Sequence, residues 1–357
     1  MINCSSLFCR ITFVSLILIG SVGSAFAQGG GNSAYNFLNL TALPRVAALG
    51  GKVAALDESD GAVIFNNPAH LTSELHNRLS LSYVSYFADI KYGYASYTRS
   101  FGRYGNAGIG LQHVSYGSFI AADETGLIDG SFSGYEMAIY ANYSYTFDSL
   151  ITVGVALKPV FSHLEQYRSS GVCADLGVSY TSHSHLFSAG IAARNIGSMV
   201  KPFTPGNFEP LPFEIIAGVS QKLKYAPFRF VVTLHQLQNL NLYYERGKET
   251  STFFGNESEE KKPVLERYGS EFLSHLIVGV EFTPVKNFYV RGGYNYQRRN
   301  ELKIVEKAST VGFSWGVGIK INRFVISYSR AVYHLAGASN HFSLSTNLTD
   351  FFSPTKL

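Results

Sequence analysis

Apolar and polar residues alternate along most of this chain, from about residue 79 to its C-terminal end. In the stretch 135–147 every odd position is apolar or aromatic, whereas the even positions include Glu136 and other polar residues. The same period of two occurs in 172–180 and in 311–321. Because successive side chains of a β-strand point to opposite sides of a sheet, this pattern predicts strands with one apolar face.

Fourteen such segments can be counted, and the spacing between them is informative. They start near residues 79, 92, 107, 135, 151, 171, 186, 213, 228, 273, 288, 310, 324 and 340. The connections after the even-numbered segments are tight. Most of those after the odd-numbered segments are long, namely 117–134, 162–170, 196–212, 245–272 and 298–309. Outer-membrane barrels have an even number of strands, short periplasmic turns and longer outer loops, so this alternation predicts a barrel with periplasmic termini.

The composition favours a membrane barrel over a large secreted β-sandwich or β-solenoid. The chain has 23 Tyr, 27 Phe and 34 Gly, and only 15% of its residues are charged, whereas soluble domains usually have ~25%. The non-apolar faces hold Gly, Ser, Asn and charges, as a wet lumen requires, and aromatic residues recur near strand ends, as in interfacial girdles. The predicted fold class is therefore all-β: a transmembrane antiparallel β-barrel of about 14 strands.

The first 27 residues have the pattern of a secretory signal peptide. Arg10 precedes the apolar run ITFVSLILIG, and an Ala-x-Ala site ends at Ala27. A transmembrane helix is the alternative, but the run is shorter than the ~20 apolar residues that a span needs. Without the signal, 28 basic and 25 acidic residues leave a charge of +3, and Cys173 is the single cysteine. This balance argues against nucleic-acid binding, and export with a barrel predicts the outer membrane of a Gram-negative bacterium.

The stretch 45–71, RVAALGGKVAALDESDGAVIFNNPAHL, does not alternate. Gly50 and Gly51 let the backbone turn sharply between two apolar clusters. Asn67, Pro68 and Ala69 form a second expected turn, in which the proline can open a short helix. A barrel of fourteen strands is wide enough to need filling, so we expect this piece to form a small N-terminal plug in the lumen. The chain then divides into a signal peptide, a plug segment and a barrel, at 1–27, 28–78 and 79–357.

The same stretch resembles the N-terminal motif of the PorV/PorQ family, which belongs to the fatty-acid-transporter-like outer-membrane barrels. In that family an N-terminal hatch ends in a similar Asn-Pro-Ala turn. The likeness continues through SYFADIKYGYASY, EPLPFEI, APFRF, GYNYQRRNELKI, FSWGVGIKIN and RAVYHLAGASNHFSLSTNL. The resemblance implies a component of the type IX secretion system, which moves folded cargo across the outer membrane. It also implies as partners a surface protein of the PorZ type and an attachment complex with a PorU-like sortase and a PorV-like barrel.

Residues that could carry chemistry are scattered along the chain. There is no Gly-x-Ser-x-Gly elbow and no Gly-x-x-x-x-Gly-Lys phosphate loop. His183 and His185 share a predicted turn, but they have no obvious cysteine or carboxylate partner for a metal ion. Cys173 has no evident base beside it. The basic pair Arg298 and Arg299 at the outer rim suits lipopolysaccharide phosphates, although a solvated rim is the simpler interpretation. We therefore expect no enzyme activity, no metal and no cofactor.

Two functions remain open. The first is a structural component of the type IX secretion system, which lies in outer-membrane lipid and anchors a surface partner through its outer loops. The second is a transporter or channel for hydrophobic compounds, which needs an apolar lumen pocket, whereas the predicted lumen faces are mainly polar or Gly. We assign no role to loop 245–272. The candidate partner-loop aromatics, which could instead belong to the interfacial girdle, are Phe119, Phe132, Phe203 and Phe208.

Overall fold

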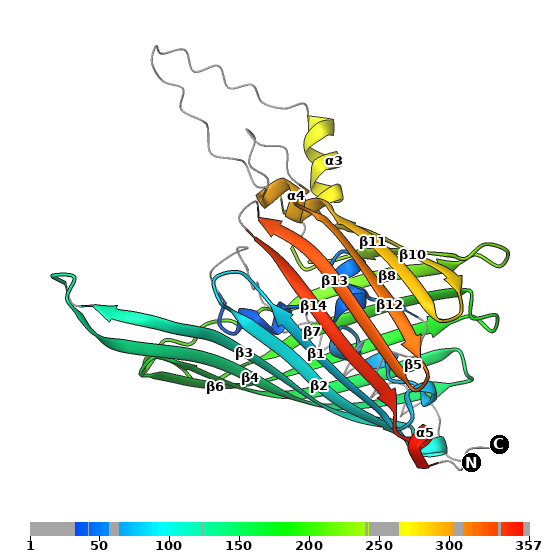
Figure 1. Ribbon diagram of the computed structural model, residues 1–357, viewed down its shortest axis with the longest axis horizontal. Coiled ribbons are helices and arrows are strands. Elements are labelled where there is room, and N and C mark those ends of the chain that lie inside the picture. Colours follow the sequence, from blue (N-terminus) through cyan, green and yellow to red (C-terminus); the bar gives the residue numbers. More distant parts are fainter. Residues whose placement is uncertain are drawn as a thin grey trace, which may run out of the picture. The chain divides into compact units, whose positions relative to one another are not determined.

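The alternating segments form fourteen strands that pair in chain order and close into an antiparallel barrel in the computed structural model (Figure 1). β1 pairs with β14 along its whole length, which closes the sheet. The strands are β1 (Arg78–Ser85), β2 (Lys91–Ser100), β3 (Asn106–Ala122), β4 (Ile128–Phe147), β5 (Ile151–Leu164), β6 (Tyr167–Thr181), β7 (Phe187–Lys201), β8 (Glu214–Lys222), β9 (Phe228–Leu234), β10 (Leu276–Val285), β11 (Phe288–Asn295), β12 (Phe313–Ile321), β13 (Phe324–His334) and β14 (Gly337–Asn347). The predicted fold class and strand number are confirmed.

The structure describes most of the chain but not all of it. The described residues are 33–41, 43–56, 64–122, 124–239, 242, 264–302, 310–334 and 337–352. The expected signal peptide, 1–27, lies outside them. No helix in these ranges is long and apolar enough to cross a membrane.

Each strand separates an apolar outer face from a polar inner face. In β4, Tyr143 and Phe147 are exposed on the outside, whereas Glu136 is buried on the inside. In β12, Trp315 is exposed and Ser314 is buried. The predicted faces of these strands are therefore confirmed. A closed ladder with an apolar exterior satisfies the backbone hydrogen bonds of every strand, which is the condition for spanning lipid.

The two rims of the barrel differ in the length of their connections. The turn rim holds only short connections: 101–105, 148–150, 182–186, 223–227, 286–287 and 322–323. The opposite rim, here called the long-connection rim, holds the three longest connections, 202–213, 235–275 and 296–312, together with the short ones 86–90, 123–127, 165–166 and 335–336. β1 begins and β14 ends at the turn rim, so the barrel's first and last residues lie at the same end.

Two of the predicted long loops are wrong, because strands continue through them. β3 and β4 remain paired beyond Tyr135, through Ser118 with Ser133 and Phe119 with Phe132, so the expected loop 117–134 is mostly ladder. Where 162–170 was expected to be a loop, β5 and β6 are joined by two turn residues. Gly and Ser interrupt the alternation in these stretches, so the pattern along the chain did not show that the strands continue.

The other predicted loops are partly ordered. β7 occupies the first part of 196–212, so the connection there is 202–213. Loop 245–272 ends in helix α3 (Val264–Ser274), and 298–309 begins in helix α4 (Tyr296–Leu302). Residues 243–263 and 303–309 lie outside the described residues.

The described residues between 33 and 75, here called the plug, contact strands on opposite walls of the barrel and so lie in its lumen. Their helices are η1 (Asn36–Asn39), α2 (Pro44–Ala48), η3 (Pro68–His70) and η4 (Ser73–Leu75). α2 packs on β11–β14, whereas η3 packs on β4–β6. The ring of Phe65 lies edge-on to two wall rings, with centroids 4.5 Å from Tyr94 and 4.7 Å from Tyr140. The hydrophobic core of the protein therefore lies between the plug and the wall.

Glycines in the wall let the plug backbone approach the strands closely. A Cβ added at Gly154 would overlap the backbone of Pro68, and one at Gly177 would overlap the side chain of Asn67. On the opposite wall, a Cβ at Gly293 would overlap the backbone between Ala48 and Gly50. The lumen glycines that suggested a wet interior are thus the surface on which the plug rests.

The two turns expected in the plug have specific backbone requirements. Gly50 and Gly51 both have φ = +106°, a conformation that residues with a Cβ rarely adopt. Asn67 accepts a hydrogen bond from the backbone nitrogen of Ala69 at 2.9 Å and donates one to Ala54 at 3.0 Å. Pro68 follows as the first residue of η3. These turns set the two ends of the plug against opposite walls.

Replacing Gly177 by Ala should displace the plug, because the new methyl group would occupy the position of the Asn67 side-chain oxygen. We expect a lower unfolding temperature in detergent and faster proteolysis within the plug. Gly292→Ala is the matched control, since a Cβ at that wall position meets nothing within 4 Å. Equal protease resistance of the two variants would contradict close packing of the plug on this wall.

Candidate functional site

A buried ion cluster fastens helix α2 to the wall. Arg45 donates two hydrogen bonds to Glu281 of β10, at 2.9 and 3.1 Å. Arg291 of β11 donates a third to the same carboxylate, at 2.6 Å. All three side chains are buried. A carboxylate held between two guanidinium groups makes charge-assisted hydrogen bonds, which are stronger than neutral ones and fix the position of α2.

A second cluster fastens the other half of the plug. Glu214 of β8 is paired with Lys52 of the plug and with Arg194 of β7. Arg194 also donates to the carbonyl oxygens of Leu38 and Phe65, at 3.2 and 3.3 Å. One wall arginine thereby satisfies buried backbone acceptors in two separate parts of the plug.

A third cluster lies within the wall. Lys158 of β5 contacts both Asp175 of β6 and Asn195 of β7, and its side chain is fully buried. Asn195 in turn donates to Asn39 of the plug at 3.2 Å. Asp175 and Glu281 are both buried on the inner face of their strands. Their partners come from other strands and from the plug, so the pattern along the chain carried no signal for the pairing.

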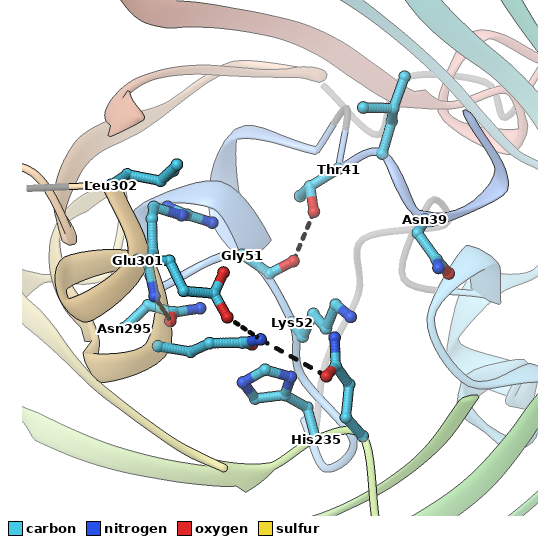
Figure 2. A pocket seen from close by; sticks show the side chains of 12 residues that line it. Asn39, Thr41, Gly51, Lys52, His235, Asn295, Glu301 and Leu302 are labelled. Atoms are coloured by element: carbon cyan, nitrogen blue, oxygen red, sulfur yellow. Dashed lines mark hydrogen bonds between the residues drawn. The ribbon is translucent and has the colours of Figure 1, made fainter. Parts of the chain in front are cut away.

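A polar cavity of about 260 Å³ lies at the long-connection rim, between the plug, α4 and the ends of β9 and β11 (Figure 2). Figure 2 shows α4 on one side, with its Glu301, and the plug on another, with Thr41, Gly51 and Lys52. Residues His235 and Gln236, which follow β9, line it from the wall. Of the basic rim pair noted in the sequence, Arg298 lines this cavity and donates to the carbonyl oxygen of Gly50 at 3.4 Å.

His235 is the most unusual residue of this cavity. It is 2% exposed, and neither ring nitrogen has a hydrogen-bond partner among the described residues, although Nδ1 lies 3.9 Å from Oε1 of Glu214. Burial, and then the nearby charge of Lys52, lower the pKa of His235 to about 3. The imidazole is therefore neutral at physiological pH and keeps one donor and one acceptor without a described partner. No sequence motif pointed to His235, because its environment arises only when the plug closes over β9.

The residues noted for chemistry in the sequence do not come together. His183 and His185 are exposed in the turn between β6 and β7, and Cys173 is buried in β6. Within the described ranges, no group of three or more His, Cys, Asp or Glu side chains is placed to hold a metal ion.

The four candidate partner aromatics lie in different environments. Phe119 and Phe132 stack across the β3–β4 ladder, with ring centroids 5.2 Å apart, and Phe208 is 62% exposed. Phe203 instead packs toward the plug, 6.3 Å from the ring of Tyr35. Phe203 is therefore partly buried, because the connection 202–213 folds back onto the first residues of the plug.

The β3–β4 hairpin extends beyond the rest of the wall (Figure 1). β2 pairs with β3 only as far as Ser115, and β5 pairs with β4 only from Gly134. Residues 118–122 and 128–132 therefore form a two-stranded ribbon whose outer edges have no neighbouring strand among the described residues. Its end carries three apolar side chains with exposed fractions of 69–70%, those of Ile120, Leu127 and Ile128.

Comparison with solved structures shows which known proteins share this fold. No family model and no curated protein matches this chain. The toluene transporter TbuX of Ralstonia pickettii is 14% identical, with a TM-score of 0.53, over 88% of this chain and 100% of TbuX. A deltaS2 mutant of the TodX monoaromatic hydrocarbon channel is 13% identical, with a TM-score of 0.51, over 87% of this chain and 98% of its own. The chain thus has the fold of these outer-membrane β-barrels.

Replacing Glu281 by Gln should destabilise the protein, because Arg45 and Arg291 would lose the carboxylate that both contact. Removing one partner of a buried ion pair costs about 3–5 kcal/mol. Thermal unfolding in detergent measures this loss. The double variant Glu281→Gln, Arg45→Met removes one of the stranded cations and should recover part of it. A single variant that unfolds at the wild-type temperature would show that the cluster does not hold α2.

His235 should make the protein sensitive to acid. Its pKa is about 3 in the folded protein and ~6.5 in an unfolded chain, so between these values only the unfolded state binds the extra proton. The free energy of unfolding should therefore fall as the pH drops below ~6.5, by up to about 1.4 kcal/mol per unit. His235→Gln should lose this contribution, which unfolding curves of both proteins from neutral pH to ~4 would reveal. Parallel pH profiles would contradict the assignment.

Proposed function

We propose that the protein is a structural, non-enzymatic outer-membrane barrel that holds a surface protein at its long-connection rim. The observation that carries this proposal is the β3–β4 ribbon, which stands beyond the barrel with apolar side chains and open edges. The sequence resemblance to PorQ adds the setting: a type IX secretion system, with a surface partner of the PorZ type in a complex with a PorU-like sortase and a PorV-like barrel.

The ribbon has the physical properties of a docking element. A two-stranded ribbon alone is only marginally stable in water. Its edges present backbone donors and acceptors on which another strand can pair. Proteins use such edges to bind partners by adding a strand, with side-chain contacts providing specificity. A partner strand beside Phe119 or Phe132 would complete the hydrogen bonding and cover the exposed apolar side chains.

The packing of the lumen supports a static role. The plug is held by two buried ion clusters and by close contacts with wall glycines on both sides. Moving it would break several charge-assisted hydrogen bonds together. A barrel that serves as a fixed support at the surface has no need for such movement.

Passage of a hydrophobic compound is the second candidate, and the comparisons favour it over anchoring. Both solved structures reported above are described as a transporter or a channel for aromatic hydrocarbons. Fold alone does not establish function, because one fold supports unrelated activities. For this chain, passage through the lumen requires that the plug move away from the wall.

Shortening the ribbon tests the anchoring role. Ser118 and Ser133 are directly paired, so replacing 119–132 by Asn-Gly would close the hairpin with a favoured two-residue turn. We expect the barrel to fold and remain in the outer membrane, while the surface partner is lost from the cells and recovered from the medium. Tyr225→Ser, at an exposed position of the turn rim, is the matched control and should retain the partner.

A second variant separates the apolar contact from the strand edges. In this variant Ser replaces Ile120, Leu127 and Ile128. The ribbon keeps its full length, but partner retention should be weaker. If both ribbon variants retain the partner while uptake of labelled toluene depends on the intact protein, the anchoring proposal is wrong and the transport candidate is supported.

A further inference from the structure

Most of the residues that line the cavity at the long-connection rim have polar side chains (Figure 2). Among the described residues that line it, only Leu40 and Leu302 are apolar. Its volume of about 260 Å³ lies below the ~300–1,000 Å³ of pockets that take drug-sized ligands. The cavity therefore has room for a small molecule only, which would meet polar groups at defined positions.

The charges around the cavity leave an excess of positive charge. Glu214 is shared between Lys52 and Arg194, so this buried group has two cations and one carboxylate. Helix α4 adds no net charge to the cavity, because it contributes one cation, Arg298, and one carboxylate, Glu301. Glu301 lies at the exposed edge and accepts a hydrogen bond from Gln297 at 2.7 Å. Lys52 reaches the cavity with part of its side chain accessible.

His235 gives an independent indication of a ligand. Its two ring nitrogens are buried beside the cavity without a described partner, and buried polar groups in native proteins are nearly always hydrogen-bonded to protein, water or ligand. Other polar side chains of the lining are already engaged, since Thr41 donates to Gly51 and Gln297 donates to Glu301. The imidazole thus provides unused hydrogen-bonding capacity, and it lies beside the ammonium group of Lys52, which is paired with Glu214.

We propose that this cavity binds a small hydrophilic oxyanion, a carboxylate or phosphate carried on a molecule without an alkyl chain. The ammonium group of Lys52 attracts the charge, and the neutral imidazole of His235 donates or accepts one hydrogen bond to the ligand. The amide of Asn295 lines the same cavity and is held in place by hydrogen bonds with Gly50 and Arg298. This site does not depend on the proposed anchoring function, because it is formed by the plug, α4 and the wall, and the β3–β4 ribbon takes no part in it.

Calorimetric titration of the purified full chain in detergent tests the site. The probes are inorganic phosphate, glucuronate, glucose and octanoate. We expect at least one of the first two to bind, and glucose to bind weakly or not at all because it lacks charge. Octanoate, which has a carboxylate on an alkyl chain, should bind less tightly than glucuronate, because its chain makes no hydrogen bonds with the polar side chains of the lining. His235→Ala should weaken binding about tenfold, the effect of losing one hydrogen bond to a charged group. His341→Ala, at a buried lumen histidine outside the cavity, should leave binding unchanged.

Each of the other outcomes overturns the proposal. Failure of phosphate and glucuronate to bind at millimolar concentration would mean that the cavity holds only water. Glucose binding as tightly as glucuronate would remove the role of the charge, and preferred binding of octanoate would indicate an apolar ligand. The comparison of glucuronate with glucose uses the wild-type protein, so it decides the question even if His235→Ala does not fold.

Discussion

A closed sheet of fourteen strands encloses a lumen wider than its own side chains can fill, and the rest of this structure depends on how that space is occupied. The chain fills it with its own residues before the first strand. Apolar side chains of the plug, such as Phe65, then form the hydrophobic core with wall residues such as Tyr140. The outer faces of the strands are left for lipid, as the exposed rings of Tyr143 and Trp315 illustrate.

Filling a barrel from within places polar groups where water cannot reach them. Arg45 and Lys52 carry charges into the lumen, and each meets a wall carboxylate, Glu281 or Glu214. Such pairs contribute little net stability compared with an apolar core, but a single unpaired member would be costly. Together with wall glycines such as Gly177, they specify one position of the plug and make other positions unfavourable.

The features that distinguish this chain from a generic barrel lie at the long-connection rim. The β3–β4 ribbon extends beyond the wall there, and the polar cavity with His235 lies below α4 at the same rim (Figures 1 and 2). The fold is shared with proteins described as hydrocarbon transporters, yet function resides in sites rather than in folds. An exposed ribbon and a small polar cavity are properties suited to binding at a surface, whereas the packed plug opposes free passage.

The sequence by itself determined the strands, their number and the face of each side chain, because a period of two is a local property of the chain. It did not reveal the length of the β3–β4 ladder, since Gly and Ser interrupt the alternation around Phe119. It also could not pair Arg45 with Glu281, which are separated by 236 positions, or show that His235 lies beside Lys52. Only the tertiary structure decided these contacts, because they form when the barrel closes around the plug and brings distant residues into a shared interior.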